Sequence, residues 1–257
     1  MFSIFLDIIH TNWHVILLFF TVAVLYASVG FGGGSSYLAI LALTGIAFTQ
    51  IRATALLCNI IVVLGNVFWY QKNSQIDWKK TIPLVFCSIP LAFLGGYLKI
   101  DETIFFILLG ITLIVVAVMM LLINRTSEKN KKNELHIGEN IFFGSFIGFI
   151  SGLVGIGGGI FLAPLLHLTN WDTAKKIAAT ASFFILVNSI SGLLGQFSNH
   201  DFDINWHLTS FLLMTVLIGG QIGSRLSNKI LTAIQLKRIT AILVAIVGLR
   251  ILIKYIL

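Results

Sequence analysis

The pattern Gly-x-Gly-Gly-Gly occurs twice in the chain, each time inside an apolar stretch. The first copy is GFGGG at 30–34 and the second is GIGGG at 155–159, which is 125 positions later. Glycine is a poor residue for a helix interior and costs about 1 kcal/mol relative to alanine. Four glycines in five residues therefore predict that the chain breaks its helical course at two corresponding points.

The similarity between the two halves extends well beyond the glycines. Three further pairs of segments match at offsets of 126 to 128: IRATA at 51–55 with IAATA at 177–181, IDW at 76–78 with INW at 204–206, and LG at 94–95 with IG at 222–223. Such a fixed spacing is the mark of an internal repeat. We expect a first transmembrane repeat over 1–123, a charged cytoplasmic linker over 124–140 and a second transmembrane repeat over 141–257.

Composition places both repeats in a membrane. The chain is 57% hydrophobic and 11% charged, with a mean hydropathy of +0.97, and a helix needs about 20 mostly apolar residues to cross a bilayer. The apolar segments run over 13–29, 36–48, 53–70, 81–98, 103–123, 141–154, 160–169, 177–196, 207–224 and 239–257. We predict an all-α polytopic membrane protein in which segments 36–48 and 160–169 are too short to cross.

The distribution of basic residues predicts how the repeats are oriented. Basic loops stay on the cytoplasmic side, and 13 of the 17 Lys and Arg residues lie in 70–80, 124–139, 170–176 and 225–238. Corresponding loops of the two halves differ in charge, so they are expected on opposite sides. We predict two inverted structural repeats, each with a glycine-broken helix pair and three transmembrane helices. Parallel repeats stay an alternative if each broken pair crosses an odd number of times.

The glycine breaks are the candidate binding site. Short helices that begin just after Gly34 and Gly159 would direct unpaired N–H groups and positive dipole ends into the protein, which favours an anion. Close helix packing is the plainer interpretation of one motif, but two equivalent copies favour a site. The candidate substrate-binding residues are Gly32, Gly33, Gly34, Ser35, Ser36, Thr54, Asn59, Gly157, Gly158, Gly159, Thr180, Ser182 and Asn188.

Several of these side chains have a second interpretation. Ser35 and Ser36 can cap the first short helix or offer hydroxyl donors. Thr54 and Thr180 are equivalent across the repeat and fit either cavity lining or interhelical hydrogen bonding, whereas Asn59 and Asn188 fit packing somewhat better. Arg52 is a candidate charge at the cavity mouth, although a solvated arginine at a helix end is the more ordinary interpretation.

The sequence offers no chemistry for catalysis. Asp and Glu are absent from the interior of the full spans, and there is no Walker motif. We therefore expect no enzyme activity, no catalytic residues, no metal and no cofactor. The two cysteines lie in apolar spans and fit small core residues.

With both motifs in view, the chain resembles the TauE/SafE family of sulfite exporter-like membrane transporters. The resemblance rests on the two glycine motifs, on Ala163-Pro164, on 179–182 (ATAS) and on 219–223 (GGQIG), and it covers about 15–250. One departure is Ala39, which stands where Pro164 stands in the second half. The family implies a multi-pass protein of the bacterial or archaeal cytoplasmic membrane that moves sulfite, sulfonates or related anions.

These observations predict a secondary transporter of small anions that works by alternating access between the two repeats. Its expected partners are a small anionic substrate and the lipid bilayer, with no nucleic acid, and it could act as a homo-oligomer. The alternative is a non-transporting membrane scaffold or a subunit of a larger membrane complex, in which the glycine motifs are only packing faces.

Overall fold

The computed structural model describes residues 2–122, 137–169, 171–199, 202, 204–225 and 233–256, and these contain helices and no strands. The helices of the first half are α1 Phe2–Ser28, α2 Gly34–Ala42, α3 Phe48–Lys72, α4 Trp78–Tyr97 and α5 Glu102–Leu122. Those of the second half are α6 Ile137–Val154, α7 Gly159–Leu168, α8 Ala174–Phe197, α9 Trp206–Arg225 and α10 Ala233–Ile256. Every predicted apolar segment is a helix, so the all-α prediction is confirmed.

The outer surface and the helix lengths fit a bilayer. Six helices are long and apolar enough to span a membrane, namely α1, α3, α4, α5, α8 and α9. Large apolar side chains face outward along them, and Phe86 and Phe197 are 74% and 68% exposed. Exposed apolar surface on this scale is stable only against lipid or another protein. The protein is therefore a multi-pass membrane protein.

Both short helices lie directly after a glycine motif, as expected. The α2 helix has 9 residues and α7 has 10, so each is about 15 Å long and covers about half of the bilayer's apolar core. One predicted boundary is wrong, because the first short segment ends at Ala42 rather than at residue 48, and Phe48 already belongs to α3. Helix α6 begins at Ile137, so residues 137–140 of the predicted linker are helical. Residues 124–136 of that linker lie outside the described part of the chain.

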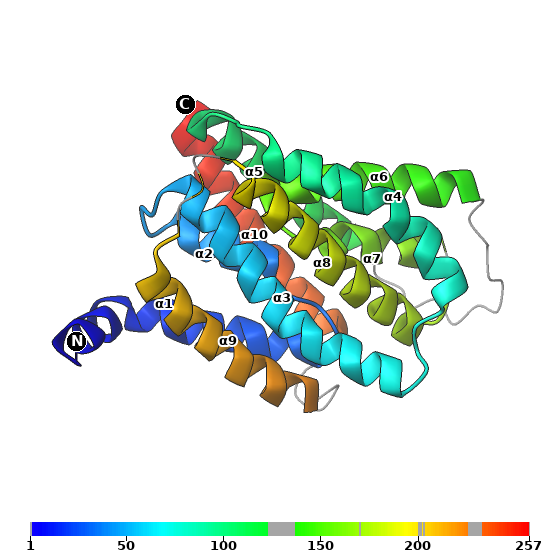
Figure 1. The fold of residues 1–257 in the computed structure, drawn as a ribbon, viewed down its shortest axis with the longest axis horizontal. Helices are drawn as coiled ribbons and strands as arrows, with labels where there is room; N and C mark the ends of the chain where they lie inside the picture. Colours follow the sequence, from blue (N-terminus) through cyan, green and yellow to red (C-terminus); the bar gives the residue numbers. More distant parts are fainter. Residues whose placement is uncertain are drawn as a thin grey trace.

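The long helices pack in pairs that join the two halves (Figure 1). The α3 and α8 helices lie side by side in the middle and run antiparallel. The α4 helix packs on α6 and α8, the α9 helix packs on α1 and α3, and α5 packs on α10. The core is thus shared between the halves.

Glycines let these helices approach backbone to backbone. In α6, Gly144, Gly148 and Gly152 are spaced four residues apart and face α4. A Cβ atom at Gly152 would lie 2.0 Å from the carbonyl oxygen of Ala92. Small residues at this spacing are typical of close membrane helix pairs, and here they bring α4 and α6 together.

Candidate functional site

The two glycine breaks have similar backbone shapes, which differ at one position because Gly157 has a positive φ of 86° and its counterpart Gly32 does not. Gly30 and Gly33 have φ values of 86° and 90°, and Gly155 and Gly158 have values of 85° and 80°. These lie in the left-handed region that glycine adopts without a steric penalty. The chain can therefore leave one helix and start the next within five residues, which explains why glycine stands at these positions.

Each break ends in an uncapped helix N-terminus. Gly33 and Gly158 are the N-cap residues, and neither helix has a side-chain cap hydrogen bond. The prediction that Ser35 or Ser36 caps α2 is wrong, because Gly33 precedes the helix and the hydroxyl oxygens of Ser36 and Tyr26 lie 2.8 Å apart in a hydrogen bond. The first N–H groups of both short helices are thus available to a ligand.

Asn59 of α3 brings the two motifs together. Its Nδ2 atom donates a hydrogen bond of 2.8 Å to the carbonyl oxygen of Ile156. Side chains at Gly32, Gly34 or Gly157 would collide with it, because their Cβ atoms would lie 2.3–2.7 Å from the amide of Asn59. The glycines of both halves therefore close around one polar side chain at the centre of the molecule.

A cavity of about 30 Å³ lies at this meeting point. Its lining includes the three glycines 32–34, Ser35, Asn59 and Gly159. The hydroxyl oxygen of Ser35 and the Oδ1 atom of Asn59 are buried without a hydrogen-bond partner among the described residues. Buried polar atoms are nearly always paired, so these two atoms indicate a ligand or water. The present volume suits a water molecule or two.

The cavity wall also includes residues that the sequence did not single out, namely Tyr26, Met120 and Ile185. The internal repeat could have identified Ile185, because this residue stands 126 positions after Asn59. It packs against Gly159, whose Cβ would lie 2.3 Å from its side chain, as Asn59 packs against Gly34. The two halves thus place an amide and an aliphatic chain at equivalent points of the cavity wall.

The two threonines do not line this cavity. The hydroxyl oxygens of Thr54 and Thr209 lie 3.0 Å apart, and those of Thr180 and Thr81 are also 3.0 Å apart. The pairs link α3 to α9 and α8 to α4. Their place in the structure therefore fits the packing interpretation.

Ser182 and Asn188 lie on α8 and contact backbone carbonyls. Ser182 donates hydrogen bonds to the carbonyl oxygens of Gly30 and Ala178, and Asn188 donates to that of Phe184 across 2.9 Å. Ser182 thereby holds the first glycine break from the second half, much as Asn59 holds the second break from the first half. Gly158 packs against Phe184.

Arg52 is not the solvated helix-end residue that the sequence favoured. It is 5% exposed. Its Nη2 atom lies 3.4, 3.5 and 3.2 Å from the carbonyl oxygens of Gly95, Gly96 and Gly152. These carbonyls belong to the last turns of α4 and α6, where backbone acceptors lack helical partners and carry partial negative charge. The two helix ends therefore hold the arginine inside the protein.

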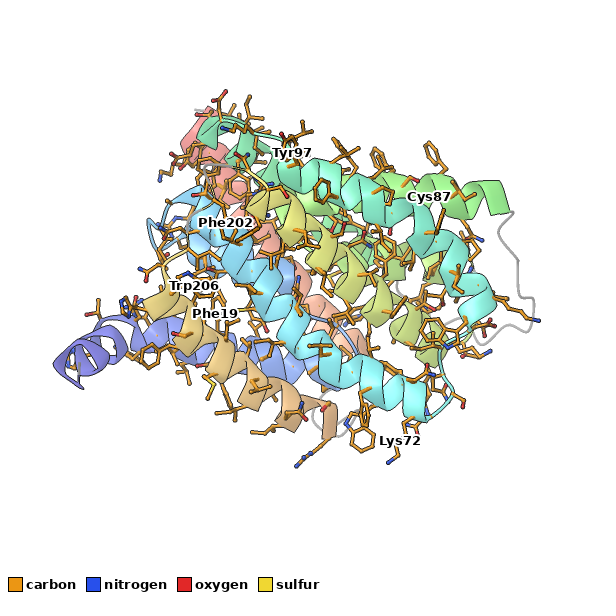
Figure 2. All side chains as sticks on the ribbon, in the orientation of Figure 1. Phe19, Lys72, Cys87, Tyr97, Phe202 and Trp206 are labelled. Carbon is orange, nitrogen blue, oxygen red and sulfur yellow. The ribbon has the colours of Figure 1, made fainter. Side chains whose placement is uncertain are left out.

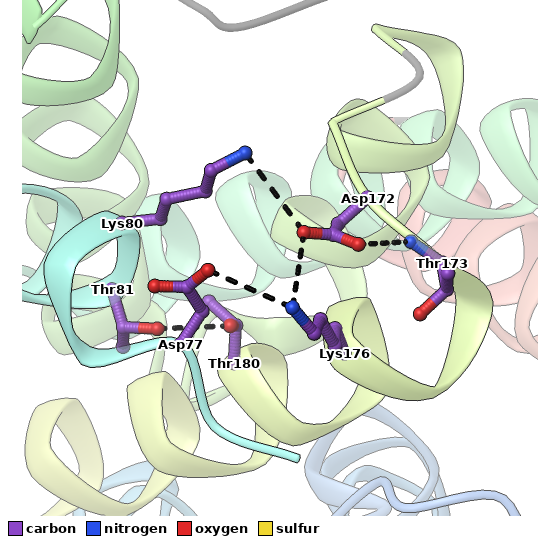
Figure 3. Close-up of polar contacts among 7 residues, drawn as sticks. All are labelled: Asp77, Lys80, Thr81, Asp172, Thr173, Lys176 and Thr180. Carbon is purple, nitrogen blue, oxygen red and sulfur yellow. Dashed lines mark hydrogen bonds and ion pairs between the residues drawn. The ribbon is translucent and has the colours of Figure 1, made fainter. Parts of the chain in front are cut away.

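At the opposite end of α3 and α8, charged residues tie the halves together (Figure 3). Lys176 lies 3.7 Å from both Asp77 and Asp172, and Lys80 lies 3.9 Å from Asp172. Asp172 also accepts a hydrogen bond from the backbone N–H of Thr173. Nothing in the sequence pattern predicted contact between these charged residues. Within the described residues no group of His, Cys, Asp and Glu could hold a metal ion.

Comparison with known proteins identifies the family. The family described as "Sulfite exporter TauE/SafE" matches residues 15–251. The chain belongs to the TauE/SafE family. The resemblance carried by the glycine motifs is thus confirmed, and both motifs lie inside the matched region.

Relatives of this TauE/SafE protein carry transporter names. The "Probable membrane transporter protein y4hK" of Sinorhizobium fredii is 34% identical, over 91% of this chain and 95% of its own length. The "Probable membrane transporter protein MJ0441" of Methanocaldococcus jannaschii is 27% identical over 84% and 86%, and the "Probable membrane transporter protein YunE" of Bacillus subtilis is 26% identical over 74% and 77%. No solved structure matches the chain. The family and these relatives indicate a membrane transporter.

Proposed function

We propose that this TauE/SafE protein is a secondary transporter of small anions, with sulfite or organosulfur compounds as the substrate class. The observation that carries the proposal is the convergence of two uncapped helix N-termini on one buried cavity with unpaired polar atoms. Substrate would bind among Gly32–Ser35, Asn59 and the second motif, Gly157–Gly159.

The chemistry of the cavity favours an anion. The α2 and α7 N-termini present N–H donors and the positive ends of two helix dipoles, and Ser35 adds a hydroxyl donor. No carboxylate lines the cavity among the described residues. Asn59 Oδ1 is an acceptor, so it suits a protonated oxygen of the substrate or a bridging water. An oxyanion that carries one proton, such as hydrogen sulfite, meets both requirements.

The arrangement of helices supports inverted repeats. The equivalent helices α3 and α8 run antiparallel (Figure 1). The α4–α6 and α4–α8 contacts correspond to α9–α1 and α9–α3 contacts. Equivalent glycines make equivalent contacts, because Cβ atoms at Gly95 and Gly223 would each lie 2.3 Å from the carbonyl oxygens of Phe149 and Val24, respectively. The antiparallel course of α3 and α8 favours inverted over parallel repeats, and the matching contacts support the internal repeat itself.

An inverted repeat with broken helices supports alternating access. Transporters of this kind place the substrate where discontinuous helices meet and expose it by moving one bundle against the other. Here the cavity is small and enclosed by both halves, so the structure fits a closed state between the two open ones. The basic loops favour a cytoplasmic location for the N-terminal ends of α4 and α8, at Trp78 and Ala174, with the protein in the cell membrane.

Uptake into proteoliposomes tests the proposed function. The purified protein would be reconstituted and supplied with sulfite, thiosulfate, short sulfonates and carboxylates, one at a time. We expect saturable movement of at least one sulfur oxyanion or sulfonate, absent from protein-free vesicles and reduced in the Asn59→Leu variant. Correctly folded protein that moves none of these anions would contradict the proposal and favour a non-transporting scaffold.

A further inference from the structure

A second cavity, of about 60 Å³, lies at the end of the molecule opposite the ion-pair cluster. Its polar lining is Thr49, Arg52, Lys99, Gln196 and Asn199. Phe202, which also lines it, and the nearby Tyr97 mark this end in Figure 2, whereas Lys72 marks the opposite end. By the distribution of basic loops, this is the outer end of the protein.

The cavity holds buried hydrogen-bond donors without partners. Among the described residues, the Nε atom of Arg52 and the Nε2 atom of Gln196 have none, and the two residues are only 5% and 6% exposed. A guanidinium group has five N–H donors in a fixed fork, and its contacts with the helix ends at Gly95, Gly96 and Gly152 all use Nη2. Part of the donor capacity of Arg52 therefore remains unused among the described residues.

The charges around the cavity favour an anion. Arg52 and Lys99 both line it, and no carboxylate does so among the described residues. A buried cation and unpaired buried N–H groups are costly unless a partner neutralises them. An oxyanion would accept hydrogen bonds from both Arg52 and Gln196 and would pair with the guanidinium in the geometry that arginine prefers.

Both cavities are lined by α3, which contributes Arg52 to the second cavity and Asn59 to the glycine cavity. Arg52 and Asn59 are seven residues apart, so they lie on one face of α3 about 10 Å from each other. Gly155 packs on Arg52, since its Cβ would lie 3.2 Å from the Cα atom of Arg52, and Gly157 packs on Asn59. One glycine loop therefore touches both residues.

The other end of the molecule has different residues at the equivalent positions. Ala178 corresponds to Arg52, and Tyr70 corresponds to Gln196, both at an offset of 126. Tyr70 fills the space beside Gly30, where a Cβ would lie 2.2 Å from its hydroxyl oxygen. Neither residue supplies a cation, so the two ends differ in chemistry at these two positions.

We propose that Arg52, Gln196 and Lys99 form a second oxyanion site, where an anion is held on its way between the outer surface and the glycine cavity. The staging role rests on the proposed transport of anions, whereas the binding site does not. Arg52 supplies the charge and the fork, Gln196 supplies a second donor, and Lys99 raises the local concentration of anions.

Thermal stabilisation of the purified protein by sulfite, sulfate, phosphate or acetate, at ionic strength matched with sodium chloride, tests the site. Gln196→Leu is the main variant, because it removes an amide nitrogen without a partner and is expected to fold. We expect at least one oxyanion to stabilise the wild type, with an apparent dissociation constant roughly tenfold weaker in Gln196→Leu. Arg52→Lys should weaken binding similarly, since it keeps the charge and loses the fork.

Two comparisons separate this site from the glycine cavity. Arg225→Gln removes an exposed arginine of α9 and should leave anion binding unchanged. Asn59→Leu should strongly reduce anion flux yet keep the thermal stabilisation by anions that depends on Gln196. Wild-type affinity in both Gln196→Leu and Arg52→Lys, or no stabilisation of the wild type by any of the four anions, would overturn the second site. If neither the wild type nor any variant moved an anion, but the stabilisation that depends on Gln196 persisted, the result would count against the proposed function and leave the second site standing.

Discussion

The side-chain amide of Asn59 donates a hydrogen bond to the backbone carbonyl of Ile156 across 2.8 Å, which joins the long α3 helix of the first half to the glycine break of the second. Ser182 of α8 makes the reciprocal contact with Gly30. Each break is thus held by a helix of the other half. If one half moves against the other, these two hydrogen bonds must either break or pull the glycine breaks with them. The glycine breaks are therefore coupled to any such movement.

Replacing Asn59 with Leu should impair both stability and transport. The carbonyl of Ile156 would lose its partner in a buried place, which typically costs about 1–3 kcal/mol. We expect a lower melting temperature and a strongly reduced anion flux. Asn73→Ala, at the exposed end of α3, is the control and should change stability by less than about 0.5 kcal/mol. Wild-type flux in Asn59→Leu would show that this amide is no part of the site.

Gly152→Ala should destabilise the protein far more than Gly138→Ala, although both are in α6. A Cβ at Gly152 meets the carbonyl of Ala92 at 2.0 Å, whereas a Cβ at Gly138 meets nothing within 4 Å. Overpacking of this kind typically costs about 1–3 kcal/mol or more, while alanine at an open helical position is neutral or favourable. Thermal unfolding in detergent measures the difference. Equal melting temperatures would contradict the close α4–α6 packing.

Thr54→Val and Thr180→Val should each have a small effect. Each removes one interhelical hydrogen bond, and such bonds in membrane proteins contribute about 0.6 kcal/mol on average. We expect a slightly lower melting temperature and an unchanged apparent KM for the transported anion. A tenfold increase in KM for either variant would instead place that threonine in the substrate site.

The ion-pair cluster should respond unequally to removal of its two acids. Asp172 has a side chain that is 1% exposed, with Lys80 and Lys176 beside it, whereas Asp77 is 26% exposed. Exposed ion pairs contribute about 0–1 kcal/mol, but the buried carboxylate of Asp172 contacts both lysines, so its removal takes away two ion pairs at once. Unfolding should therefore show a larger loss of stability for Asp172→Asn than for Asp77→Asn. The reverse order would contradict the burial of Asp172.

Local features of the fold could be predicted from the sequence. Apolar segments became helices, and the two glycine motifs became breaks, because backbone conformation there depends on the residues themselves. The end of the first short helix was misplaced, since the stretch from Leu43 to Ala47 is apolar enough to resemble a helix.

Contacts between distant helices could not be predicted in the same way. The pairing of Thr54 with Thr209 and the burial of Arg52 depend on which helices meet. A single sequence shows which residues along a helix are polar, but it does not show which other helices pack against that helix. Arg52 looked solvated because the carbonyls that hold it belong to α4 and α6, about 45 and 100 residues further along the chain.

Access to Ser35 from the two sides of the membrane tests the central claim most directly. Ser35→Cys would be made in a background with Cys58→Ala and Cys87→Ser, which removes both native cysteines. The variant would be reconstituted in vesicles and treated from either side with a membrane-impermeant, negatively charged thiol reagent. A substrate site with alternating access predicts reaction from both sides, slowed by the transported anion. No reaction from either side, or reaction at one rate with and without the anion, would contradict transport through the glycine cavity.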